Sequence, residues 1–558
     1  MTSRPISRGC LAILIASLCA AAAGSVRVSA QDVGTEAQRE SGKKLYLKYC
    51  SQCHGEQGDG EGYAAPHLRP RPRNFTTGKF KIRTTPTGAL PTHEDLVNII
   101  RHGMPYTSMP AWPNFSDQEV SDLAYFVTTF SPDFAKPENA PKPVPLPSAP
   151  KATKESIELG KKLFEDNGCL KCHGSLGRGD GPSAPTLMDD WGSPIRPADL
   201  AQNWTFRGGS SREDIFRAMS TGLNGTPMPS FLEALTPEQR WAITDFVFSL
   251  SGGNGPSYTN LVVAKHVQEP IDLKKGAASF ASAPVARLAI VGQIMEPGRA
   301  FHPPATSVAV QAIYDADSIA LLVRWHDMSA QKSGTNGPSL PLPPEEEEEA
   351  APTPPQSPGG APTPGGDVFG EPEAAPTGQA SEFSDAVSIQ IPSQVPAGAR
   401  KPYFIFGDAE DSVDLWFFDL ARPDPLQFTG KGSGNIAPST AGDLTGVASY
   451  DQGEWSVIFK RPRRAASGAM LSPGQFMPIA FSVWDGFSRE RGNRRGLTLW
   501  NSLYVGPEVV PSAVGPMLRT AFFFLAIELV VIGLVRRRYA RARGELGGQE
   551  RQQPATST

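Results

Sequence analysis

The sequence predicts a multidomain protein with two similar all-α units, an all-β sandwich and one C-terminal transmembrane helix. Three observations support this fold class: a cysteine–histidine motif that occurs twice, a later region of short β-type runs separated by turns, and an apolar segment near the C-terminus that arginines follow. At 558 residues, the chain is long enough for three folded units and an anchor. Its formal net charge of −4 predicts no nucleic-acid partner.

Residues 1–30 are typical of a secretory signal peptide. They begin with a basic region, continue with an apolar stretch from Leu11 to Ala23, and end in a small-residue cleavage site at Ala30. We therefore expect the mature chain to be exported. Cys10 and Cys19 lie in the predicted signal peptide, so only four of the six cysteines remain in the mature chain.

The four remaining cysteines lie in two pentapeptides, Cys50-Ser-Gln-Cys53-His54 and Cys169-Leu-Lys-Cys172-His173. The Cys-x-x-Cys-His spacing is typical of c-type haem attachment. Two thiols three residues apart reach both vinyl groups of one porphyrin, and the adjacent imidazole meets the iron. A zinc site with four thiolates is the alternative. We predict covalent haem attachment and iron ligation by these residues: Cys50, Cys53, Cys169, Cys172, His54 and His173.

A methionine–proline pair follows each motif at the same distance. Met109 and Met228 each lie 55 residues after the histidine of the preceding motif. A thioether is a natural sixth ligand for haem iron and a poor ligand for zinc. We therefore predict two covalent haems with Met109 and Met228 as distal ligands. Met104 also precedes a proline, but Leu223 occupies the aligned position in the second unit, which favours Met109.

The repeat extends beyond the ligands. A Gly-Lys-Lys-Leu string followed by an aromatic residue precedes each motif, at residues 42–46 and 160–164. After each methionine, a Ser or Thr with Glu or Gln three residues later opens an apolar segment, at residues 116–119 and 236–239. This pattern is a helix-capping box, and the apolar residues that follow recur at helical spacing.

Each unit therefore has a helix, the motif, a long loop with Met-Pro, and a closing helix. This order resembles the class I cytochrome c fold over residues 35–135 and 153–252, with a Pro-rich linker at 136–152. The resemblance implies His/Met ligation of each haem. His67 and His102 are less favoured candidates for ligation, because histidines beside a haem more often pack or hydrogen-bond at the surface.

Six basic residues follow the first motif with no acidic residue among them: Arg69, Arg71, Arg73, Lys79, Lys81 and Arg83. One interpretation is a docking face for an acidic redox partner. The interpretation that we favour is that one or two arginines pair with haem propionates while the others lie in solvent.

Residues 255–505 have a different character. Short β-type runs alternate with turns, which predicts an antiparallel sandwich of the immunoglobulin-like type. Within this region, residues 336–380 are dominated by Pro, Gly, Ala and a run of Glu. Such a composition buries too little apolar surface to offset the entropy of ordering, so it predicts a disordered insertion.

Four strings in the β-rich region carry a second resemblance: Trp325-His-Asp327, Val413-Asp-Leu-Trp416, Trp455-Ser-Val-Ile-Phe-Lys460-Arg-Pro462 and Ala480-Phe-Ser-Val-Trp-Asp-Gly486. They resemble the haem b-binding γ subunit of ethylbenzene dehydrogenase and of the dimethylsulfide, selenate and chlorate molybdoenzymes. This resemblance implies one haem b held between a methionine and a lysine, with Lys460 as the candidate lysine.

The candidate methionine of the haem b site is not in its usual position. Phe406 stands where the family has methionine, and three other methionines are possible substitutes: Met295, Met328 and Met477. A sandwich without haem that serves as a docking platform is the alternative.

From Thr520 to Val535 the chain is apolar except for Glu528, and arginines follow directly. About twenty residues are needed to cross a bilayer, which predicts a transmembrane helix at 514–535. By the positive-inside rule, the arginines place residues 536–558 in the cytoplasm. We therefore expect a single-pass protein of the bacterial inner membrane with the bulk of the chain in the periplasm. Glu528 faces either the helix of a partner subunit or, when protonated, the lipid.

Together, the two resemblances imply a membrane-anchored dihaem c-type cytochrome that acts as a non-catalytic electron-transfer subunit of a respiratory oxidoreductase complex. The implied partners are a molybdopterin α subunit and an iron–sulfur β subunit, with other cytochromes or a terminal oxidase as further partners. Two alternatives remain open. One is a dihaem peroxidase-type enzyme, which needs an iron with a displaceable ligand. The other is a carrier cytochrome whose sandwich binds a ligand other than haem.

Overall fold

The computed structural model describes these residues: 33–68, 70–251, 255, 257–300, 303–342, 382–396, 398, 400–439, 442–465, 468–508 and 514–549. The predicted signal peptide lies outside the described residues, as does most of the predicted insertion. The chain divides into two compact units, Met1–Val505 and Gly506–Thr558, which are described separately.

Two helical domains whose α-helices follow the same order begin the first unit. The first helical domain consists of α2 (Glu36–Tyr49), α3 (Ser51–His54), η1 (Ala65–His67), α4 (His93–His102), α5 (Asp117–Thr128), η2 (Pro132–Ala135) and η3 (Pro137–Asn139). The second consists of α6 (Lys154–Asp166), α7 (Leu170–His173), η4 (Ala184–Thr186), η5 (Asn203–Thr205), α8 (Arg212–Thr221) and α9 (Pro237–Leu250). The six longer helices all begin with a capping box, which confirms the boxes expected before α5 and α9.

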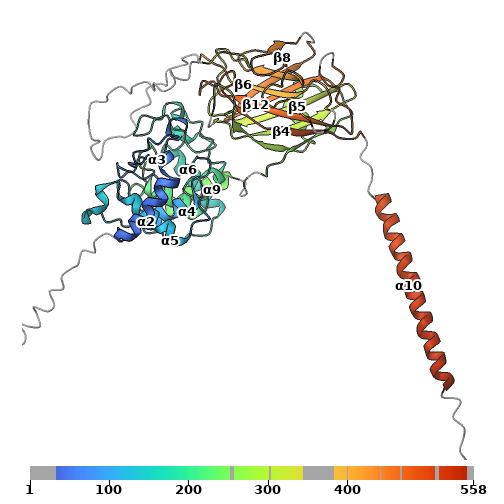
Figure 1. The fold of residues 1–558 in the computed structure, drawn as a ribbon, viewed down its shortest axis with the longest axis horizontal. Coiled ribbons are helices and arrows are strands. Elements are labelled where there is room, and N and C mark those ends of the chain that lie inside the picture. The colour runs from blue at the N-terminus through green and yellow to red at the C-terminus, as the bar shows by residue number, and fades with distance from the viewer. Residues whose placement is uncertain are drawn as a thin grey trace, which may run out of the picture. The chain divides into compact units, whose positions relative to one another are not determined.

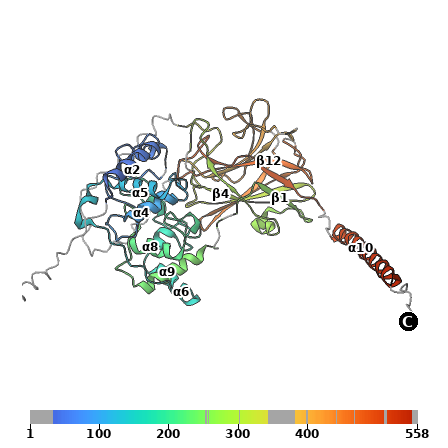
Figure 2. The same ribbon diagram turned by 60° about the horizontal axis from the view of Figure 1, so that its bottom comes forward.

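The first and last long helices of each domain pack directly against each other, α2 against α5 and α6 against α9 (Figure 2). A glycine lies at each crossing. A Cβ atom added to Gly42 would lie 2.0 Å from the carbonyl oxygen of Asp122, and one added to Gly160 would lie 1.9 Å from that of Ala242. The glycines of the repeated Gly-Lys-Lys-Leu string therefore allow two helix backbones to touch, which explains why the string occurs in both domains.

We expect Gly160→Ala to destabilise the second helical domain by about 1–3 kcal/mol, because the methyl group forces α6 away from α9. The better helix propensity of alanine offsets only part of this cost. Denaturant unfolding of the full chain measures the change. Gly208→Ala in the same domain is the control, since its added methyl group lies at an ordinary 3.5 Å from Ile82. Equal stability of the two variants would contradict the explanation.

A sheet domain follows, from β1 to β14. Its elements are β1 (Leu261–His266), η6 (Leu273–Phe280), β2 (Ala286–Ala289), β3 (Val291–Gly292), β4 (Ser307–Tyr314), β5 (Ser318–His326), β6 (Ala386–Pro392), β7 (Val413–Asp419), β8 (Leu426–Gly430), β9 (Ile436–Pro438), β10 (Thr445–Asp451), β11 (Glu454–Pro462), β12 (Phe476–Trp484), β13 (Gly496–Leu497) and β14 (Asn501–Val505). The main strand order is β10-β11-β5-β4-β1-β14-β12-β6-β7-β8-β9.

The sheet folds into two layers because β12 pairs with β14 through its first half and with β6 through its second half. Figure 1 shows β8 and β6 above β5 and β4. Side chains from both layers form one core, in which Trp416 and Trp455 are buried. The two-layered sandwich therefore agrees with the prediction from the short β-type runs that alternate with turns.

The expectation of a purely antiparallel sandwich was wrong at β1. This strand runs parallel to both neighbours, with Leu261 beside Ser502 of β14 and Ala264 beside Ala312 of β4. Parallel neighbours require a long connection between them. Here η6 and β2 lie on the connection from β1 to β4, and the rest of the domain separates β1 from β14. The hydrophobic pattern predicts a strand but does not determine the direction of its neighbours.

The predicted insertion at 336–380 begins inside the folded part of the sheet domain. Asn336 is buried, and its side-chain amide donates hydrogen bonds to the carbonyl oxygens of Ser384 (2.7 Å) and Glu490 (3.0 Å). The described residues continue to 342, and the remainder of the predicted insertion lies outside them.

The second unit contains α10 (Val514–Gln549). Among the described residues, this is the one helix that is long and apolar enough to span a membrane. The candidate segment is Val514–Arg543, and its most apolar 18-residue window has a mean hydropathy of 2.2. The helix continues through the arginine cluster instead of ending near 535 as expected. Its 36 residues correspond to roughly 54 Å, which exceeds the apolar thickness of a bilayer. The unit therefore suits a membrane anchor with a helical polar extension.

Candidate functional site

The two Cys-x-x-Cys-His motifs have the same local structure. Cys50 is both the C-cap residue of α2 and the N-cap residue of α3, and His54 is the last residue of α3. In the second domain, Cys169 caps α7 and His173 ends it. A glycine with φ of 76° follows the first motif, and one with φ of 75° follows the second. Each motif therefore places two thiols and an imidazole on one short helix that stops at a left-handed glycine.

The same contact orients both histidines. Nδ1 of His54 lies 3.0 Å from the carbonyl oxygen of Arg73, and Nδ1 of His173 lies 3.1 Å from that of Ala198. A ring that donates its Nδ1–H to a carbonyl group presents Nε2 to a metal. Burial lowers the pKa of both imidazoles, which favours the neutral form that metal ligation requires.

Met109 and Met228 lie in equivalent loops after α4 and α8. The main-chain N–H of each donates to the hydroxyl group of a threonine two residues earlier, at 3.1 Å and 3.2 Å. A second main-chain hydrogen bond closes each loop. The N–H of Met104 donates to the carbonyl oxygen of Met109 at 3.1 Å, and the N–H of Leu223 donates to that of Met228 at 3.2 Å. Because Met104 and Leu223 occupy the same place in this loop, the shared geometry favours Met109 as the ligand.

The four thiols do not gather into one metal site. In the part of the chain that the structure describes, one group of His, Cys, Asp or Glu brings three ligand atoms within 4.8 Å, and its members are three aspartates of the sheet domain. Burial raises the pKa of Cys50 to about 12 and that of Cys169 to about 11, so these thiols remain protonated until they react. The tetrathiolate zinc alternative therefore has no support.

The donor set fits two c-type haems. Each domain provides two adjacent thiols, a neutral imidazole whose Nδ1 is already used, and a methionine in a hydrogen-bonded loop. The cysteines of each motif also pack against the apolar core of their own domain, Cys50 in the first and Cys169 in the second. The sequence predictions for all eight residues are supported by this arrangement and stay predictions until haem is measured.

Three of the six basic residues after the first motif contact the second helical domain. Arg83 donates a 2.8 Å hydrogen bond to the carbonyl oxygen of Thr221 at the end of α8. Lys79 forms a 2.5 Å ion pair with Asp190. The guanidinium of Arg73 lies 4.3 Å from the ring centroid of Trp191. These three side chains join the two helical domains. They therefore form neither a free docking face nor a set of solvated side chains.

A cavity of about 460 Å³ lies between the two helical domains, lined by residues of both, including Lys81 and Arg207. Burial and the nearby cations Arg207 and Arg73 lower the pKa of Lys81 to about 7. A group of buried cations that repel one another favours an anion. Pairing of one or two arginines of the basic segment with haem propionates stays a prediction.

His67 and His102 are exposed, as expected for surface histidines. Nδ1 of His102 lies 3.0 Å from the carbonyl oxygen of Asn98 in the same helix. Neither observation supports a role in iron ligation.

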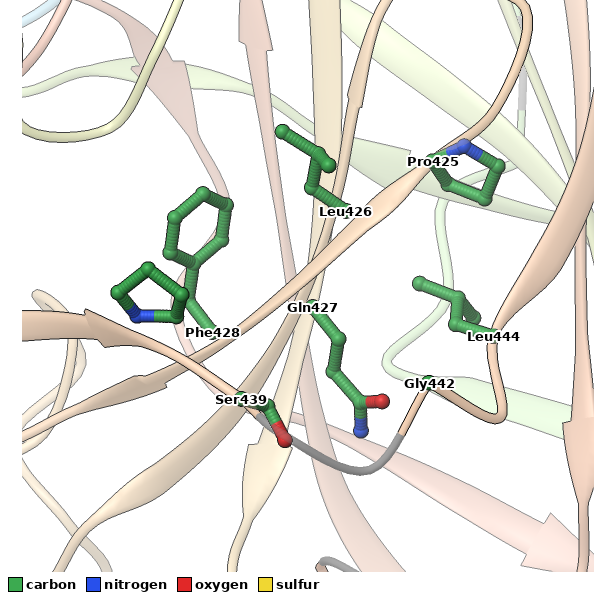
Figure 3. A pocket seen from close by; sticks show the side chains of 8 residues that line it. Pro425, Leu426, Gln427, Phe428, Ser439, Gly442 and Leu444 are labelled. Carbon is green, nitrogen blue, oxygen red and sulfur yellow. The ribbon is translucent and has the colours of Figure 1, made fainter.

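The residues around Lys460 do not fit a haem b site. Its amine donates a 2.6 Å hydrogen bond to the carbonyl oxygen of Ile271, in the segment before η6. Of the three possible methionines, Met477 and Met328 are buried and Met295 is exposed. A cavity of about 290 Å³ in the sheet domain is lined by neither Lys460 nor a methionine (Figure 3). Ligation of a haem b by Lys460 therefore stays a prediction.

Sequence analysis missed a group of buried carboxylates beside the second motif. Asp327, Asp385 and Asp485 follow or precede strands of the sheet domain, and their carboxylate oxygens lie within 4.8 Å of one another. Glu490 is buried beside them. Burial raises the pKa of Asp385 to about 7. The Trp-His-Asp and Trp-Asp-Gly strings contain two of these residues, but nothing in the sequence indicates that they converge.

Comparison with known proteins supports the cytochrome interpretation of both helical domains. Residues 37–127 match the family "Cytochrome C oxidase, cbb3-type, subunit III", and residues 157–251 match the family "Cytochrome c". The putative respiratory nitrate reductase heme subunit ORF7 of Haloferax mediterranei is 23% identical over 23% of this chain and 45% of its own. The cbb3-type cytochrome c oxidase subunit CcoP of Helicobacter pylori is 26% identical over 27% of this chain and 41% of its own. This chain thus spans less than half the length of these relatives.

Two solved structures are similar to different parts of the chain. The Kuenenia stuttgartiensis reducing HAO-like protein complex Kustc0457/Kustc0458 is 42% identical over 38% of this chain and 96% of its own, with a TM-score of 0.37. A carbohydrate-binding module of family 9 from Caldicellulosiruptor kristjanssonii is 9% identical over 45% of this chain and 98% of its own, with a TM-score of 0.23. The matched family models, together with the duplicated ligand geometry, lead to one conclusion. Residues 37–127 and 157–251 are cytochrome c-type domains, and they are similar to parts of respiratory cytochromes.

Proposed function

We propose that this chain is a membrane-anchored dihaem c-type cytochrome that serves as the electron-transfer subunit of a respiratory oxidoreductase complex. The observation that carries the proposal is that both helical domains have the same set of groups. Each has two thiols, a histidine oriented by a main-chain carbonyl group, and a loop that contains the methionine. When bound, each haem supplies reversible one-electron transfer at a potential that a methionine ligand raises.

The residues of the chain favour electron transfer over substrate chemistry. The two thiols of each motif hold the porphyrin covalently, and the carbonyl group at Arg73 or Ala198 fixes the imidazole ring. With Met109 and Met228 as the further protein ligands, neither iron would keep a position for a substrate. A peroxidase needs such a position, so the peroxidase alternative is disfavoured.

The partner complex is inferred from two resemblances. The Haloferax mediterranei relative is named as a heme subunit of a putative respiratory nitrate reductase. The γ-subunit resemblance of the sheet domain implies a molybdopterin α subunit with an iron–sulfur β subunit. We propose a complex of this type on one side of the electron path, and another cytochrome or a terminal oxidase on the other.

The anchor sets where the exchange takes place. The arginines at the end of the apolar segment favour a cytoplasmic C-terminus, which leaves both cytochrome domains in the periplasm of a bacterial inner membrane. A tether raises the effective concentration of the haems near membrane partners.

Haem content and peroxide turnover of the purified full chain test the proposal. We expect a pyridine haemochrome spectrum with two c-type haems per chain, complete reduction and reoxidation, and no turnover of peroxide. An additional b-type haem would support ligation by Lys460. Fewer than two covalent haems, or peroxide turnover by the purified protein, would contradict the proposal.

Co-purification from the native membrane tests the proposed partner. Molybdenum that co-purifies with the chain would support a molybdopterin subunit, and an iron–sulfur complex without molybdenum would contradict it.

A further inference from the structure

The second proximal histidine depends on a segment that has no regular secondary structure of its own. His173 contacts the carbonyl oxygen of Ala198 at 3.1 Å. Residues 195–199 belong to no helix or strand. Main-chain hydrogen bonds hold the segment near its ends, from Ile195 to Leu187 and from Leu200 to Gly177, and side-chain contacts hold it between them. The orientation of the histidine therefore depends on what holds the segment.

The sheet domain holds this segment on both sides of Ala198. Two residues before it, Arg196 donates hydrogen bonds to a carboxylate oxygen of Asp485 at 2.7 Å and to the hydroxyl group of Ser488 at 2.8 Å. One residue after it, the carboxylate of Asp199 forms a 3.3 Å ion pair with Arg178 of its own domain and lies 3.8 Å from Nε2 of His326 at the end of β5. Ala198 is thus placed between two contacts to another domain.

The contact with Asp485 is strong because it is largely shielded from water. The Asp485 side chain is 3% exposed, whereas that of Arg196 is 34% exposed. Asp485 also accepts hydrogen bonds from the main chain and hydroxyl group of Ser488, at 3.1 Å and 3.2 Å. A charge-assisted hydrogen bond in such surroundings is stronger than an exposed one. Asp485 and Ser488 therefore form a fixed socket for the Arg196 guanidinium.

The first motif uses the same plan with a different neighbour. Its acceptor is the carbonyl group of Arg73, and the Arg73 side chain stacks on Trp191 of the second helical domain at 4.3 Å. In the first motif the residue that contacts the proximal histidine is itself anchored by the next domain, and in the second its neighbour Arg196 is. A change at Asp485 therefore acts on the second haem site without touching the first.

We propose that the sheet domain tunes the second haem, with Asp485 and Arg196 as positioning residues for the Ala198 carbonyl group that binds His173. This inference rests on the proposed function, because it requires a haem bound at His173. A hydrogen bond to the far nitrogen of a ligating imidazole makes the ligand more basic, and second-shell hydrogen bonds of this kind tune a metal site. A more basic ligand favours the oxidised metal, so loosening the Ala198 segment raises the reduction potential.

Asp485→Asn in the full-length chain tests the proposal. Asparagine keeps the shape of the socket but removes its charge. We expect a potentiometric titration to show two steps. Only the reduction potential of the second haem moves upward, by ~59 mV, which corresponds to a tenfold change in the equilibrium constant for one-electron reduction. Loss of a buried negative charge moves the potential in the same direction, so a second variant without a charge change is required.

Ser488→Ala supplies that second variant, since it removes hydrogen bonds to both Arg196 and Asp485 and leaves every charge in place. We expect a smaller upward shift of the same step. Asp245→Asn is the matched control: Asp245 pairs with Arg212 inside the second helical domain, is equally buried, and belongs to the packing of α8 against α9. Asp245→Asn also removes a buried negative charge, so we expect the control to show only the upward shift that a lost charge causes, smaller than the shift of Asp485→Asn.

Three outcomes would overturn the proposal: no shift in either socket variant, an equal shift of both haems, or an equal shift in the control. Failure of the proposed function is a different result. A chain that carries no covalent haem at the second motif shows a single step or none in the wild type, before any variant is compared.

Discussion

Met109→Leu is expected to lower the reduction potential of the first haem and to open its iron to carbon monoxide, whereas Met104→Leu leaves both properties unchanged. Loss of the thioether removes the ligand that raises the potential of His/Met haems. Axial ligands spread haem potentials over about 0.8 V, so we expect a decrease on the order of 0.1 V or more. Potentiometric titration and the visible spectrum of the reduced protein with carbon monoxide measure the two effects.

The second helical domain shows that leucine is compatible with the position of Met104. Leucine already occupies the position of Met104 there, at Leu223, and the loop keeps the same main-chain hydrogen bond. Met104→Leu therefore copies a side chain that this loop accepts. If Met104→Leu lowered the potential and Met109→Leu did not, the ligand assignment in the first domain would be wrong, and the equal spacing of the two Met-Pro pairs would have another cause.

Local features of the cytochrome domains were predictable because they depend on residues close together in the chain. The Cys-x-x-Cys-His spacing requires only one helical turn, and a capping box requires four residues. The repeat of both in two units of equal spacing made the domain order predictable as well. Gly42 and Gly160 belonged to a visible repeat, although their function at the helix crossings became clear only when the opposing carbonyl groups were located.

Contacts between domains were not predictable, because their partners lie far apart in the sequence. Arg83 was expected to pair with a propionate or lie in solvent, and instead it binds the carbonyl group of Thr221, more than a hundred residues away. Likewise, Arg196 and Asp485 come from different domains. Hydrophobic periodicity predicts that a segment is a strand, but its neighbour and direction depend on the whole topology, as β1 shows.

These contacts make the second helical domain central to the first unit of the chain. On one side, Arg83 binds the end of α8, and on the other side, Arg196 binds Asp485 of the sheet domain. The first helical domain contacts the second in this way, and its Tyr106 side chain also interacts with Tyr258 and with Arg287 of the sheet domain. The buried ion pair between Arg196 and Asp485 belongs to the second helical domain, so loss of haem from the second domain is expected to loosen that additional contact as well.

Replacing both cysteines of a motif by alanine tests this asymmetry. We expect either double variant, Cys50→Ala with Cys53→Ala or Cys169→Ala with Cys172→Ala, to halve the haem stain of the denatured chain and to lower its mass by one haem. The second-motif variant should be cleaved faster in limited proteolysis, with cuts on both sides of the second helical domain. Bound haem stabilises the fold that holds it, and Cys169 packs in the core of that domain. Equal proteolysis of the two variants would show that the interfaces do not depend on the haem, and an unchanged stain would show that the motifs do not attach it.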